Sequence, residues 1–264
     1  MTTMSPDLFI LAPADWMLPI ACALMVGMSK AGLPGLGTIA VPLMAMVFPP
    51  TVSTGILLPI LITGDIFGVT YYHRHTDWKL LWRLIPAALV GVVIGFFMLK
   101  QLMRGNIDRA NEIIRIGIGS LILLLVALNL LREKLRLSEI SELPPKWSMS
   151  IAITFGLLAG ITTQIANAAG PITLIYLLAM KLPKESFIGT GTWYSCIINL
   201  CKVPFMIKLG SISTDSLIFN LKLVPFVLVG TVLAIVISSK MSRKNFEKWA
   251  ILLTIIAALK LLHK

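Results

Sequence analysis

Residues 30–38 read Lys30-Ala31-Gly32-Leu33-Pro34-Gly35-Leu36-Gly37-Thr38 and separate two apolar runs of the chain. Glycine and proline at this density prevent a continuous helix. The apolar run that follows, at residues 37–48, is too short to cross a bilayer alone, because a transmembrane helix needs roughly 20 residues. A second interruption, Gln164-Ile165-Ala166-Asn167-Ala168-Ala169, precedes another short run at residues 170–180. We therefore predict two broken helices.

The composition places these breaks in a membrane protein. The chain has 264 residues, of which 57% are hydrophobic and 13% are charged, and its mean hydropathy is +0.89. A soluble domain carries roughly 25% charged residues, so an ordinary water-soluble fold is excluded. The net charge of +11 comes mainly from short Lys and Arg tracts between apolar runs, which is a topology signal. A nucleic-acid partner is therefore not expected, and the lipid bilayer is the expected surrounding.

Eight longer apolar runs accompany the two short ones, at residues 16–30, 51–71, 81–99, 113–131, 147–166, 186–207, 217–238 and 245–262. The two halves resemble one another at an offset of 133 to 139 residues, which pairs Gly27 with Gly160, Gly91 with Gly230, and Asp65 with Asn199. Weak internal symmetry of this kind is typical of transporters. We predict one transmembrane repeat at residues 1–131, a polar cytoplasmic linker at 132–146 and a second repeat at 147–264. A chance alignment of common Gly and Pro residues is the alternative.

The predicted fold is an all-α polytopic membrane protein with two inverted five-segment repeats. It has about ten transmembrane segments, including the two short broken ones. Because each repeat has an odd number of segments, the second repeat is inverted relative to the first. If the amino terminus lies outside the cell, most of the 23 Lys and Arg residues fall on the inner side of the membrane. The basic connection at residues 100–115 opposes this orientation. A topology with eight crossings, two re-entrant hairpins and parallel repeats is the alternative.

The breaks are the first candidate binding site. Irregular backbone at membrane depth must face protein, water or a ligand. A helix amino terminus offers unpaired N–H groups and about half a positive charge, so it favours an anion. The candidates at the breaks are Lys30, Gly35, Gly37, Thr38, Gln164, Asn167 and Gly170, with Thr162 and Thr163 as further hydrogen-bonding groups. Close packing of helices is the alternative explanation for such glycines, and a lysine that snorkels to the membrane surface is the alternative for Lys30.

A third polar cluster lies in the second half of the chain. It contributes the candidates Thr190, Thr192, Trp193, Ser195, Asn199 and Lys202. On a helix Ser195, Asn199 and Lys202 share one face. A lysine inside a span normally has a partner or a function, so Lys202 either binds an anion or neutralises Asp65. Asp65 is a candidate for proton coupling or for a structural charge pair, and Trp193 either caps a cavity or packs between helices.

The sequence predicts no enzyme. It contains no GxSxG, HExxH or Walker motif. The three cysteines, Cys22, Cys196 and Cys201, form no CxxC pair and lie in apolar stretches, so neither a disulfide framework nor a zinc site is expected. We expect no metal and no cofactor, and therefore transport driven by an ion gradient or passive permeation.

Three stretches together resemble the sulfite exporter TauE/SafE family, also called the four-toluene sulfonate uptake permease superfamily. They are the first break with Val41-Pro42-Leu43, Gly156-Leu157-Leu158-Ala159-Gly160 through Gly170-Pro171-Ile172, and residues 187–202 followed by Gly210-Ser211-Ile212. The resemblance implies a multi-pass inner-membrane carrier of small organosulfur or carboxylated anions. The family's glycine-rich segments fall on Gly32, Gly35 and Gly37 and on Gly160 and Gly170. The second segment departs from the family pattern, since polar residues replace glycines there.

The expected function is secondary transport of a small organosulfur anion, a sulfonate such as sulfoacetate or sulfite itself, by alternating access between the two broken helices. The alternatives are an anion channel or a carrier of small carboxylates, and an intramembrane enzyme or an assembly partner. Transport direction, the coupling ion and assembly as a homodimer stay open.

Overall fold

The computed structural model describes residues 6–33, 36–105 and 145–239, together with single residues between 109 and 120 and between 242 and 252. These residues form helices and connecting turns, with no strand among them. The α-helices are α1 (Met17–Ala31), α2 (Leu36–Val47), α3 (Pro50–Tyr72), α4 (Trp78–Arg104), α6 (Pro145–Ala166), α7 (Gly170–Ala179), α8 (Lys184–Lys208) and α9 (Thr214–Ser239).

Both predicted breaks are present. Helix α1 ends at Ala31 and α2 begins at Leu36, while α6 ends at Ala166 and α7 begins at Gly170. The predicted runs at 113–131 and 245–262, and the linker up to residue 144, lie almost wholly outside the described residues. Four helices of the described part are long and apolar enough to cross a membrane: Thr51–His75, Trp78–Arg104, Met149–Ala166 and Thr214–Ile237. The chain is therefore a polytopic membrane protein.

Each break reverses the direction of the chain. Helix α2 runs back along α1, since Gly37 lies against Ser29 and the Cys22 thiol donates a hydrogen bond of 3.5 Å to the carbonyl oxygen of Ala40. Helix α7 runs back along α6, because the rings of Phe155 and Tyr176 lie 5.7 Å apart. The sequence predicted the breaks, and the structure adds that the helices on either side of each break run antiparallel.

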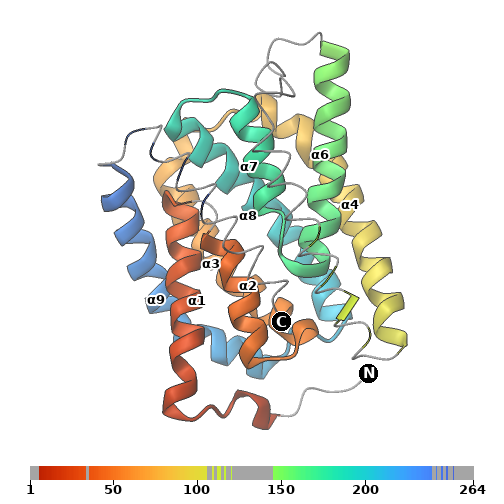
Figure 1. Ribbon diagram of the computed structural model, residues 1–264, viewed down its shortest axis with the longest axis vertical. Coiled ribbons are helices and arrows are strands. Elements are labelled where there is room, and N and C mark those ends of the chain that lie inside the picture. The colour runs from red at the N-terminus through yellow and green to blue at the C-terminus, as the bar shows by residue number, and fades with distance from the viewer. Residues whose placement is uncertain are drawn as a thin grey trace.

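Two helix pairs form opposite sides of the molecule, α1 with α9 and α4 with α6 (Figure 1). In the first pair, Gly27 lies against the backbone of Val227 and Gly230 against that of Leu24. Side chains at these two glycines would overlap the neighbouring backbone. Small residues allow such close approach of helices in a membrane.

The second pair uses glycines in the same way. Gly160 lies against the backbone of Ala88, and Gly91 lies against that of Leu157. The sequence alignment of the two halves pairs Gly27 with Gly160 and Gly91 with Gly230. The first helix of each half therefore packs on a helix of the other half: α1 packs on α9, and α6 packs on α4.

Helices α3 and α8 lie antiparallel between these outer pairs. Gly68 of α3 contacts the Thr192 side chain, and Gly189, at the start of α8, contacts the backbone of Tyr72 at the end of α3. Helix α2 leads into the start of α3, whereas α7 leads into α8, whose first turns pack on the end of α3. The two short helices therefore run toward opposite ends of α3.

Candidate functional site

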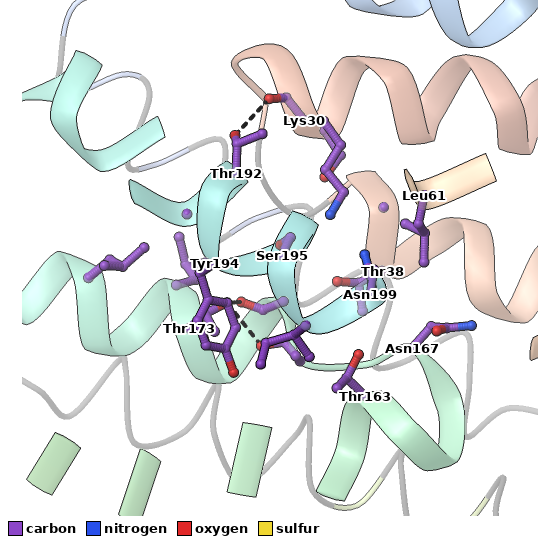
Figure 2. A pocket seen from close by; sticks show the side chains of 18 of the residues that line it. Lys30, Thr38, Leu61, Thr163, Asn167, Thr173, Thr192, Tyr194, Ser195 and Asn199 are labelled. Carbon is purple, nitrogen blue, oxygen red and sulfur yellow. Dashed lines mark hydrogen bonds between the residues drawn. The ribbon is translucent and has the colours of Figure 1, made fainter. Parts of the chain in front are cut away.

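A cavity of about 110 Å³ lies where the two breaks meet α8 (Figure 2). A water molecule needs roughly 10–15 Å³ of such space, so the cavity has room for several waters or one small solute. Its polar lining comes from α1, α2, the end of α6, the second break, α7 and α8: Ser29, Lys30, Thr38, Thr163, Asn167, Thr173, Thr192, Tyr194, Ser195 and Asn199. Apolar side chains such as Leu61, Leu174 and Phe187 complete the wall.

The amino termini of α2 and α7 both reach this cavity. Gly37 and Gly170 line it, and a side chain at Gly170 would come within 2.9 Å of the Thr38 hydroxyl. The first N–H groups of a helix lack partners within the helix, and the helix dipole makes that end positive. Two such ends converging on one cavity favour a negatively charged solute.

Asn167 shapes the second break. Its φ of 54° is in the left-handed region, which Asn tolerates better than most residues and which ends helices. The Asn167 N–H group donates a hydrogen bond of 2.9 Å to the carbonyl of Thr163, and its side-chain amide donates one of 2.8 Å to the carbonyl of Thr54 in α3. One residue therefore ends α6 and ties the break to α3.

The first break is held through the last carbonyls of α1. The Tyr72 hydroxyl donates a hydrogen bond of 3.1 Å to the carbonyl of Ala31, and the Thr192 hydroxyl donates one of 3.1 Å to that of Lys30. Gly32, with a φ of 149°, then turns the chain toward α2. These bonds satisfy carbonyls that a helix end leaves free, and they place Lys30 at the cavity.

The Lys30 ammonium forms an ion pair with the fully buried Asp65 carboxylate, with 2.8 Å between Nζ and Oδ1. The side-chain amide of Asn199 donates a hydrogen bond of 2.7 Å to the other oxygen, Oδ2. Of the alternatives left open by the sequence, the charge partner of Asp65 is therefore Lys30. Lys202 reaches Asp65 only through Asn199.

Lys202 is buried completely and lies behind the cavity wall. Its ammonium donates hydrogen bonds to the side-chain oxygens of Asn167, Thr163 and Asn199, at 2.5, 3.0 and 3.4 Å. Those three residues line the cavity, whereas Lys202 does not. No carboxylate of the described residues lies within ion-pair distance of this ammonium.

Counted with both lysines as ammonium groups and Asp65 as a carboxylate, the buried cluster has one formal net positive charge. A single buried charge is expensive in a low-dielectric interior, and a bound anion would offset it. Among the described residues no three His, Cys, Asp or Glu side chains gather as a metal site would require.

A family model described as Sulfite exporter TauE/SafE matches residues 19–261. That range covers both breaks, the cavity and every helix from α2 to α9. The chain belongs to the TauE/SafE family. Membership implies a membrane transporter of sulfite- or sulfonate-type anions. Searches among characterised proteins and among solved structures gave no significant match.

Most site residues predicted in this TauE/SafE chain gather at the cavity, but three others besides Lys202 do not line it, namely Gln164, Thr190 and Trp193. Gln164 is fully buried, with its amide 3.5 Å from the Met206 sulfur and its methylenes against Gly95. The Thr190 hydroxyl accepts a hydrogen bond of 2.9 Å from the backbone N–H of Asp77. These two side chains join helices on sides away from the cavity lining.

Trp193 packs against Trp78, with ring centroids 5.0 Å apart, so of the two readings the structure favours packing between helices. Gly35 lies outside the described residues. Ser29, Thr173 and Tyr194 line the cavity but were not among the predicted site residues. Ser29 and Tyr194 are next to candidate residues in the sequence, and Thr173 lies one turn into α7. These positions are the sequence signal that could have predicted all three as site residues.

Proposed function

We propose that this TauE/SafE protein is a secondary transporter of small organosulfur anions, with its substrate site in the cavity between α2 and α7. The observation that carries the proposal is that two lysine amino groups, of Lys30 and Lys202, share a single carboxylate, Asp65, beside two converging helix amino termini. Sulfonate or sulfite oxygens would accept hydrogen bonds from the N–H groups near Gly37 and Gly170 and from the side-chain amides of Asn167 and Asn199. Lys30 supplies a charged contact, and Lys202 acts from behind the wall.

Alternating access by two inverted repeats is the mechanism we propose, in a chain with about ten segments. Three observations support it. The short helices α2 and α7 leave the cavity toward opposite ends of α3. Helices α1 and α6 each pack on a helix of the other half. The aligned glycines Gly27 and Gly160 make these contacts, Gly27 with α9 and Gly160 with α4. The repeats at 1–131 and 147–264, the cytoplasmic linker at 132–146 and an inner-membrane location belong to the same proposal.

Counterflow in proteoliposomes tests the function. Vesicles containing the purified chain and loaded with unlabelled sulfoacetate should accumulate labelled sulfoacetate transiently, because a carrier exchanges solutes one for one. Matched vesicles without protein, and vesicles loaded with acetate, are the controls. Uptake without any stimulation by internal substrate would favour an anion channel, and stimulation by acetate alone would favour a carrier of simple carboxylates. Either result contradicts the proposal.

A further inference from the structure

Lys30 is the only charged side chain among the described residues that line the cavity, and it is already paired. Its ammonium contacts Asp65 Oδ1 at 2.8 Å, and its side chain is 12% exposed whereas that of Asp65 is fully buried. A substrate anion and the Asp65 carboxylate therefore compete for one ammonium group. An anion that takes Lys30 leaves a buried carboxylate without its charge partner, which is unfavourable.

Few charged groups lie close enough to Asp65 to replace Lys30 as its partner. The ionisable groups of the described residues that face it are Lys30 from α1 and Lys202 and Cys196 from α8. Helix α2 carries no ionisable side chain, and the basic side chains of η3 (His73–His75) are exposed at the end of α3. In α9, Lys222 lies beside the start of α1. Among these described groups Lys30 alone contacts Asp65, so a proton on Asp65 is the alternative to that ion pair.

The charge of the substrate then decides whether a proton is needed. Counted with both lysines as ammonium groups and Asp65 ionised, the empty cluster has one net positive charge, so a monoanion bound at the helix amino termini without displacing Lys30 from Asp65 makes it neutral. A dianion leaves one net negative charge unless a proton is also bound. We infer that dianionic substrates are carried together with one proton on Asp65, whereas monoanionic substrates are carried without one. This inference rests on the proposed function.

Asp65 gains a proton when a dianion binds and loses it when the dianion leaves. A proton from the water on the side where the substrate binds adds to Oδ1 of Asp65 and converts the carboxylate to a carboxylic acid. Lys30 leaves Asp65 and pairs with the second negative group of the substrate, while Asn199 keeps its hydrogen bond to Oδ2. On the other side the substrate departs, Lys30 returns to Asp65, and the proton passes to water. Nothing is oxidised or reduced.

Proton uptake per transported anion is the direct test. The full chain is reconstituted in vesicles that contain a pH-sensitive dye, with the membrane potential clamped by potassium and valinomycin. Labelled sulfoacetate, a dianion at neutral pH, should enter with about one proton per molecule, and labelled methanesulfonate, a monoanion, with none. Equal proton ratios for the two anions, or transport of methanesulfonate alone, would overturn the inference. Transport of neither anion would instead overturn the proposed function.

A variant links the proton to Asp65. Asp65→Asn removes the titrating group, so the proton ratio for sulfoacetate should fall from about one to near zero. Glu185→Gln, which removes an exposed carboxylate from the first turn of α8, should keep the ratio of the unmodified protein. An unchanged ratio in Asp65→Asn would place the proton elsewhere and contradict the inference.

Binding to the unmodified protein keeps the inference testable if that variant does not fold. Because coupling between a ligand and a proton is reciprocal, sulfoacetate affinity should rise by about tenfold per pH unit as the pH falls while Asp65 is ionised in the free protein. Methanesulfonate affinity should not change over the same range. Parallel pH profiles for both anions would refute the assignment.

Discussion

Asn199 donates a hydrogen bond of 2.7 Å to Asp65 across 134 residues of sequence. The alignment of the two halves pairs these same two positions, and the structure brings them together where α3 and α8 meet. The Asn199 carbonyl oxygen also accepts a bond of 3.4 Å from Lys202. One amide side chain therefore connects the carboxylate of one half with the buried ammonium of the other, at the edge of the cavity.

Lys202→Met should weaken anion binding without unfolding the protein. Loss of a buried charge beside the site is worth about 1.5–3 kcal/mol, which corresponds to roughly a 10- to 100-fold rise in the Kd for sulfoacetate. Thermal unfolding in detergent should change little, since relief of a buried charge that no described carboxylate pairs offsets the loss of its three hydrogen bonds. Lys208→Met, at the exposed end of α8, is the matched control. An unchanged Kd in Lys202→Met would remove Lys202 from the site.

Asn167→Gly and Asn167→Ala separate the backbone role of Asn167 from its side-chain role. Both lose the hydrogen bonds to Lys202 and to the Thr54 carbonyl, so counterflow should fall in both. Only Ala must adopt the left-handed conformation with a methyl group, which costs about 1–2 kcal/mol. Asn167→Ala should therefore unfold at a lower temperature than Asn167→Gly. Counterflow at the normal rate in the Gly variant would show that these side-chain bonds are dispensable.

The Lys30 and Asp65 ion pair can be measured with a double-mutant cycle. Lys30→Met and Asp65→Asn each leave one buried charge without its partner and should each lower the free energy of unfolding by roughly 3–5 kcal/mol. The double variant should lose clearly less than the sum, because no unpaired charge remains from the pair. Additive losses from unfolding experiments in detergent would mean that the two groups do not interact.

Gly27→Ala should destabilise the contact between α1 and α9. The added methyl group would overlap the carbonyl of Val227, and overpacking of this kind costs about 1–3 kcal/mol. Gly160→Ala should have a similar effect on α4 and α6, since it meets the Ala88 carbonyl. Gly105→Ala is the control, because the nearest atom to its new methyl group is 3.7 Å away. Equal melting temperatures for all three variants would contradict the close approach.

The positions of the breaks were predictable because their causes are local. Gly32 and Asn167 adopt positive φ values that most residues avoid, Pro171 suits the first turn of α7, and α1 and α6 end at the expected residues. The direction in which each side chain near the breaks points was not predictable. Thr163 and Gln164 are adjacent, yet one side chain meets Lys202 at the cavity and the other lies between α4 and α8. That difference depends on how α6 is rotated against its neighbours.

By itself the sequence determined a helical membrane protein with two interrupted helices and a lysine inside a span. Those features follow from the length of apolar runs, from glycine and proline geometry and from the presence of Lys202 inside a span. Only the tertiary structure decided that Lys30 pairs with Asp65, that Lys202 is held by neutral oxygens, and that α2 and α7 start at the same cavity. The reason is physical: each of these relationships joins different helices, and helix packing, which no local stretch specifies, sets the distances between them.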